Sequence, residues 1–177
     1  MERIFLLDRS GSMNVCRDDT IGGYNSFIES QNPLGGTMTL YQFDHEIIVT
    51  YCDQKIEDVV PLTRETFVPR GGTALLDAIG EVIKKSSGTP TVIILTDGHE
   101  NSSKVYTKPH IKDLIEAKEK EGWIFMYIGA NQDAFAESQS MGFQASRTLN
   151  YDVTDTPVAF ASLSQALSSV DSQFVNQ

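Results

Sequence analysis

The chain has 177 residues, of which 40% are hydrophobic and 21% are charged, and its formal net charge is −10. These values are typical of a globular protein, and this length is enough to bury a sizeable core. The excess of negative charge argues against binding to nucleic acid, which needs clusters of Lys and Arg, and no apolar run approaches the roughly 18 residues of a membrane span. We therefore expect residues 1–177 to form a single domain with neither a nucleic-acid nor a membrane partner.

The chain opens on a strand pattern rather than on a secretory signal. The apolar run Ile4-Phe5-Leu6-Leu7 is too short for a signal peptide, so the expected location is the cytoplasm. The same run predicts a central strand over residues 3–7. Thr20 is the expected N-cap of a helix that stops before Pro33.

The next two strands are predicted to form a hairpin. Residues 37–43 have a strand pattern, and Asp44-His45 then provides a tight turn into a second strand over residues 46–52. A two-residue connection permits only antiparallel pairing, so residues 46–52 are expected to form an antiparallel edge strand. Cys52 is expected to be a small packed residue of this strand, and residues 53–70 are expected to be irregular.

Helix and strand patterns alternate along the rest of the chain. They predict helix 74–86, strand 91–96, helix 108–121, strand 123–129, helix 133–141, strand 145–149 and helix 158–170. Such alternation with right-handed crossovers gives a doubly wound, Rossmann-like α/β sandwich of three layers. We expect a mostly parallel six-stranded sheet with one antiparallel edge strand.

The stretch Asp8-Arg9-Ser10-Gly11-Ser12 follows the first predicted strand and contains one carboxylate and two hydroxyls at alternate positions. In a tight loop, these three side chains can converge on one point. Ligands that are all oxygen suit a hard cation such as Mg²⁺ or Mn²⁺. Asp and Ser are also common in turns, so this stretch alone favours an ordinary turn.

Two distant segments favour a cation site over an ordinary turn. Gly71-Gly72-Thr73 precedes the predicted helix 74–86, and Asp97-Gly98 ends the predicted strand 91–96. Loops at the carboxyl ends of parallel strands meet at one edge of the sheet, where ligands bind. Taken singly, Thr73 also fits a helix N-cap and Asp97 also fits a turn before Gly.

These three segments, in this order, resemble the von Willebrand factor A domain and its metal-ion-dependent adhesion site. That site has a D-x-S-x-S loop, a Thr in a Gly-rich loop and an Asp in a T-D-G turn. The stretch from Tyr127 to Ala134 is similar to small free-standing bacterial and phage members of the family. The resemblance implies a divalent cation, Mg²⁺ or Mn²⁺, held by a set of five residues, Asp8, Ser10, Ser12, Thr73 and Asp97. It also implies a protein partner that presents an Asp or Glu to the ion.

Two other functions remain open from the sequence. One is a hydrolase, for example a phosphatase with Asp8 as nucleophile, although Ser10 stands where such an enzyme would need a second Asp. The other is a structural assembly domain with a relict site. Whether Asp18, Asp19, Asp44 or Glu100 contribute to the site is left open, although Asp18 and Asp19 fit the start of a helix and Asp44 and His45 fit a turn. Polar residues after two of the predicted strands are expected at the rim of the site: His99, Glu100, Asn101, Asn131, Gln132 and Asp133. The oligomeric state is not predicted.

Overall fold

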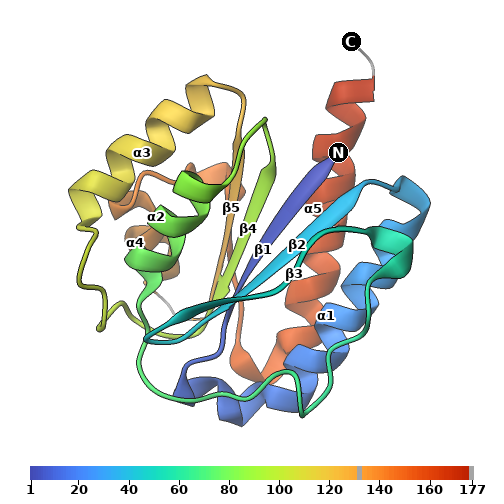
Figure 1. The fold of residues 1–177 in the computed structure, drawn as a ribbon, viewed down its shortest axis with the longest axis horizontal. Coiled ribbons are helices and arrows are strands. Elements are labelled where there is room, and N and C mark those ends of the chain that lie inside the picture. The colour runs from blue at the N-terminus through green and yellow to red at the C-terminus, as the bar shows by residue number, and fades with distance from the viewer. Residues whose placement is uncertain (131–132, 176–177) are drawn as a thin grey trace.

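The computed structural model describes residues 1–130 and 133–175, and its centre is one six-stranded sheet (Figure 1). The strands are β1 (Glu2–Asp8), β2 (Thr37–Phe43), β3 (Ile47–Lys55), β4 (Thr91–Thr96), β5 (Ile124–Gly129) and β6 (Thr148–Asn150). The helices are α1 (Arg17–Gln31), α2 (Leu75–Lys85), α3 (Lys108–Lys120), α4 (Ala134–Ser140) and α5 (Thr156–Val175). The strand order is β3-β2-β1-β4-β5-β6. Neighbouring strands are parallel except for the pair β2 and β3, as the sequence predicted.

Helices cover both faces of the sheet. Figure 1 shows α1 and α5 on one face, and α2, α3 and α4 on the other. The central strand β1 supplies both cores, because Phe5 and Leu7 pack with α1 and α5 while Ile4 and Leu6 pack on the opposite side. This explains why β1 is a continuous apolar run rather than an alternating one. Among the described residues, no helix is both long and apolar enough to cross a membrane.

The first helix begins earlier than the sequence predicted. A 3₁₀ helix over Gly11–Cys16 runs directly into α1, which starts at Arg17. The prediction of Thr20 as N-cap was therefore wrong. Thr20 is buried inside the helix, and its hydroxyl lies 3.6 Å from the sulfur of Cys16.

The edge strands also differ from expectation in detail. β3 extends to Lys55 rather than stopping at residue 52, and its pairing with β2 contains register shifts. Cys52 is exposed on this edge, so its expected packing was wrong. At the other edge, the strand predicted over residues 145–149 starts later. Residues 145–147 form a 3₁₀ turn, and the strand that pairs with β5 is Thr148–Asn150.

Two adjacent glycines of α1 provide a test of the packing between α1 and α5. A Cβ on Gly23 would lie 2.3 Å from Cδ2 of Phe160, which is itself buried against Phe5. We predict that Gly23→Ala lowers the free energy of unfolding by about 1–3 kcal/mol, because the overpacked ring has no free space. A Cβ on Gly22 meets nothing within 4 Å. Gly22→Ala is therefore expected to raise stability by about 0.5–1 kcal/mol through helix propensity alone.

Chemical denaturation of the two variants and the wild type measures both effects. Equal stabilities for the two alanine variants would contradict the described packing of α1 against α5.

Candidate metal centre

The carboxylate of Asp8 lies at the carboxyl end of β1 and has no exposed surface. The backbone N–H of Ser10 donates to its Oδ1 at 2.6 Å. The hydroxyl oxygens of Ser10 and Ser12 lie 3.1 Å apart in the same loop. The loop therefore brings its carboxylate and two hydroxyls together, as its sequence predicted.

The neighbouring strand β4 adds two side chains to this group. Because Leu7 and Leu95 are register partners, β1 and β4 end side by side. The Thr96 hydroxyl donates to Asp8 Oδ2 at 2.6 Å, and the Ser12 hydroxyl donates to Asp97 Oδ1 at 2.8 Å. The ends of β1 and β4 are thus joined by two side-chain hydrogen bonds.

Thr73 completes the group from the loop that precedes α2. A Cβ placed on Gly98 would lie 3.0 Å from Thr73 Oγ1, 3.7 Å from Ser12 Oγ and 3.8 Å from Asp8 Oδ2. Oxygens from three separate loops therefore surround one point, which stays open because residue 98 has no side chain.

The hydroxyl of Thr73 has no hydrogen-bond partner among the described residues, although Thr73 is only 3% exposed. The N-cap position of α2 is occupied by Ala74, without a side-chain cap. The alternative of Thr73 as a helix cap therefore does not describe this structure. The Thr73 hydroxyl is therefore available to a ligand or to solvent.

The site is electrostatically unfavourable without a cation. The pKa of the Asp8 carboxyl is raised to about 6, because burial and, to a lesser extent, the Asp97 carboxylate outweigh the hydrogen bonds from Thr96 and Ser10, which lower it. Burial also raises the pKa of Asp97. One buried and one partly buried carboxylate beside three hydroxyls form a donor set that suits a hard divalent cation.

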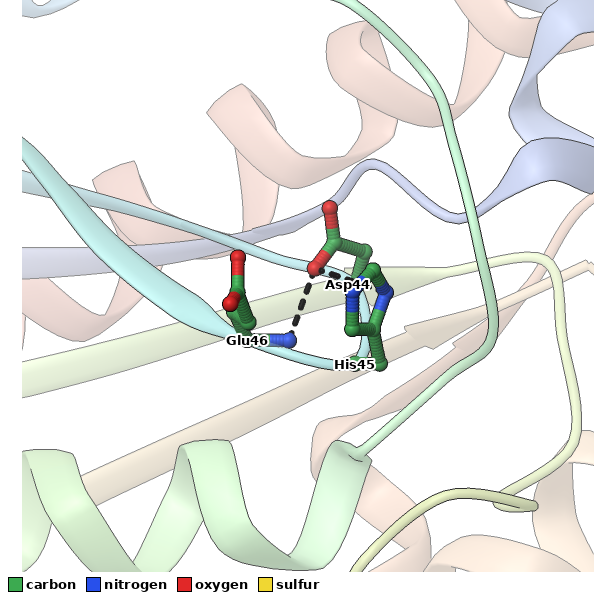
Figure 2. Close-up of side chains that lie close together, drawn as sticks. All are labelled: Asp44, His45 and Glu46. Atoms are coloured by element: carbon green, nitrogen blue, oxygen red, sulfur yellow. Dashed lines mark hydrogen bonds and ion pairs between the residues drawn. The ribbon is translucent and has the colours of Figure 1, made fainter.

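A second acidic group lies in the turn after β2 (Figure 2). The possible ligand atoms of Asp44, His45 and Glu46 lie within 4.8 Å of one another. This group is already neutralised by arginines, since Asp44 Oδ2 lies 3.0 Å from Arg9 Nε and 2.8 Å from Arg70 Nε. Arg70 also reaches Glu46 at 2.5 Å. We therefore assign the group a structural role, not a metal.

Asp44 links the loops that carry the site. Its Oδ1 accepts from the N–H of Glu46 at 2.7 Å, which closes the turn shown in Figure 2. Its backbone carbonyl accepts from the N–H of Ala74 at 2.7 Å, directly after Thr73. The predicted turn at residues 44–45 therefore also supports the loop of Thr73.

Other polar residues named in the sequence analysis lie on α1, near the start of α2 and at the start of α4. Asp18 pairs with Arg64 on the surface, and Asp19 is exposed in the first turn of α1. Glu100 accepts the N–H of Leu76 at 3.0 Å and thus caps α2. Asp133 occupies the N-cap position of α4, while Asn131 and Gln132 lie outside the described residues.

Sequence reasoning missed the role of Thr96. The only signal for it was a hydroxyl residue at the end of a buried apolar strand, directly before Asp97. A polar side chain at such a position needs a hydrogen-bond partner, and Asp8 provides it.

The raised pKa of Asp8 predicts how stability depends on pH in the absence of metal. Between about pH 4 and pH 6, Asp8 holds its proton in the folded protein but has lost it in the unfolded chain. The free energy of unfolding should therefore fall as the pH rises through this window. A difference of about two pKa units corresponds to about 3 kcal/mol.

The test is chemical denaturation of wild type and Asp8→Asn in EDTA across this pH range. The difference between their free energies of unfolding isolates the contribution of Asp8. Saturating Mg²⁺ should reverse the slope, because the ion competes with the proton. A wild-type-minus-variant difference that does not vary with pH would contradict the proposed environment of Asp8.

No protein-family model matches the chain, and no curated protein matches it. Solved structures do match its fold. Proximal thread matrix protein 1 from the mussel byssus, solved with a zinc-occupied MIDAS motif, is 17% identical with a TM-score of 0.67, over 94% of this chain and 47% of that one. The chain thus spans about half the length of the mussel protein.

Two further structures give the same result. The vWF domain of the type V pili tip protein Mfa5 from Porphyromonas gingivalis is 12% identical with a TM-score of 0.68, and the match covers 94% of each chain. Manganese-loaded TRAP from Plasmodium vivax is 16% identical with a TM-score of 0.61, over 90% of this chain and 71% of that one. With its sheet order and its single antiparallel edge pair, the chain has the fold of the von Willebrand factor A domain.

Proposed function

We propose that residues 1–177 form one metal-dependent protein-binding domain without enzymatic activity. In this proposal the ligand set is Asp8, Ser10, Ser12, Thr73 and Asp97, and the cation is Mg²⁺ or Mn²⁺. The partner is a protein that presents an Asp or Glu side chain. The cytoplasmic location expected from the sequence is part of the same proposal.

The observation that carries the proposal is the unbonded hydroxyl of Thr73. It faces the point that the Asp8 and Ser12 oxygens also surround, and Gly98 leaves that point free. The hydroxyl does not cap α2, whose N-cap position is Ala74, so it is available to a ligand. A cation bound between these oxygens would account for their convergence on one point.

A bound divalent ion would supply positive charge and an open coordination position for an outside oxygen. The protein's own charge of −10 repels an acidic partner at long range. The ion overrides that repulsion locally, and salt weakens the repulsion further. Binding should therefore depend on the ion and tolerate moderate salt.

The structural neighbours support a divalent cation in general. The mussel protein was solved with zinc in its MIDAS motif, and the Plasmodium protein was solved loaded with manganese. These ions belong to those proteins. For this chain, the all-oxygen donor set favours Mg²⁺ or Mn²⁺ over Zn²⁺.

The geometry gives less support to a phosphatase. Both carboxylate oxygens of Asp8 accept hydrogen bonds, from Ser10 and from Thr96. A phosphatase of this kind also needs a second acid beside the nucleophile, and Ser10 stands at that position. A structural domain with a relict site is the remaining alternative, and metal titration distinguishes it.

Metal binding should raise the thermal stability of the protein only when the proposed ligands are all present. We predict that Mg²⁺ at about 100 times its dissociation constant adds about 2.7 kcal/mol to wild type. Asp8→Ala should abolish this gain, whereas Asp18→Ala, which removes an exposed carboxylate paired with Arg64, should keep it. Equal gains in wild type and Asp8→Ala would sink the assignment.

Gly98→Ala tests the same site without removing a ligand. The backbone of Gly98 is not in the left-handed region, so alanine tests the space between the oxygens rather than backbone strain. We predict a weaker affinity for Mn²⁺, measured by titration calorimetry, because the new Cβ would sit 3.0 Å from Thr73 Oγ1. Wild-type affinity in this variant would place the cation elsewhere.

Partner binding is tested by affinity capture in Mg²⁺ and in EDTA, followed by measurements on the purified partner. EDTA and Asp97→Ala should both abolish binding. A partner that binds equally well in EDTA, or that binds Asp97→Ala as tightly as wild type, would show that the site does not mediate recognition.

A further inference from the structure

The loop after β4 holds the backbone of Thr73 on both sides. The N–H of Thr73 donates to Oδ1 of Asn101 at 2.8 Å. The carbonyl of Thr73 accepts from the N–H of Asn101 at 2.9 Å and from the N–H of Ser102 at 3.1 Å. One short segment therefore fixes the peptide groups on either side of the Thr73 side chain.

This segment also carries Asp97, four residues before Asn101. It is anchored to α2 by two carboxylates. Glu100 accepts the N–H of Leu76 at 3.0 Å, and Asp77 of α2 accepts the N–H groups of residues 104, 105 and 106 at 2.8 to 3.0 Å. The position of Thr73 relative to Asp97 is therefore set by a loop that is held against α2 by hydrogen bonds.

Gly72 allows the Asn101 side chain to come this close. A Cβ on Gly72 would lie 2.8 Å from Asn101 Oδ1 and 2.2 Å from the hydroxyl of Ser102. The Ser102 hydroxyl donates to the same oxygen, Asn101 Oδ1, at 2.6 Å. The second glycine of the Gly71-Gly72-Thr73 loop is thus explained by its contact with Asn101.

From these contacts we propose that Asn101 is a positioning residue, which sets the Thr73 hydroxyl toward the cation without touching the cation itself. The inference rests on the proposed metal site. Without the Asn101 oxygen, the buried N–H of Thr73 loses its partner, and the hydroxyl loses its fixed direction. Residues that orient metal ligands in this way typically change metal affinity by 10- to 100-fold.

The test is Mn²⁺ affinity by titration calorimetry on a set of variants. Asn101→Ala should bind about 10- to 100-fold more weakly than wild type. Asn101→Asp keeps an acceptor oxygen for Thr73, so it should bind as tightly as wild type or more tightly. Ser102→Ala is the matched control, because it removes the neighbouring hydroxyl but leaves the bond from Asn101 to Thr73, and it should retain most of the affinity.

A second measurement does not use metal. Hydrogen exchange of the Thr73 amide in EDTA should be faster in Asn101→Ala than in wild type, and slow again in Asn101→Asp. If Asn101→Ala does not fold, Gly72→Ala takes its place, because its Cβ displaces the Asn101 side chain and should weaken Mn²⁺ binding in the same way.

The outcomes separate this inference from the proposed function. A wild type that binds no Mn²⁺ would overturn both. A wild type that binds Mn²⁺, with equal affinity in Asn101→Ala, would overturn the role of Asn101 alone. Equal weakening in Asn101→Ala and Asn101→Asp would also overturn it, because the acceptor oxygen would then not matter.

Discussion

A carboxylate with no exposed surface, at the end of the central strand, is the constraint on which the rest of the site depends. Asp8 lies among apolar strands, where its charge is expensive unless donors or a cation compensate it. Ser10 and Thr96 donate to its two oxygens, yet burial still keeps its pKa near 6. The second carboxylate, Asp97, adds repulsion rather than relief. A cation would remove this cost.

The surrounding loops are built around that constraint. The carbonyl of Gly71 accepts from the N–H of Gly11, and the carbonyl of Arg9 accepts from the N–H of Arg70, so the loop of Asp8 and the approach to Thr73 are joined through their backbones. Asp44 is neutralised by two arginines and supports the same junction from the end of β2. Much of the polar chemistry at this edge of the sheet therefore holds loops in place. The unbonded hydroxyl of Thr73 is the feature that this role does not explain.

The sequence predicted the fold well because its signals are local and strong. Buried parallel strands read as apolar runs, and the short link at Asp44 permits only a hairpin. The set of Asp8, Ser10, Ser12, Thr73 and Asp97 was implied by the resemblance to the von Willebrand factor A domain, and the meeting of strand ends at one edge of the sheet supported it. The start of α1 was missed, because the 3₁₀ helix over Gly11–Cys16 continues into it and Thr20 is covered by tertiary packing. The sequence did not identify the partners of Thr96 and Asn101, since each partner lies in a distant segment of the chain.

The most direct test of the metal site is a crystal structure of the protein with Mn²⁺, in which anomalous scattering locates the ion. We predict one strong peak between the oxygens of Ser10, Ser12 and Thr73, with Asp8 and Asp97 contacting the ion directly or through water. A peak at Asp44, His45 and Glu46 instead, or no peak at a saturating concentration of Mn²⁺, would contradict it.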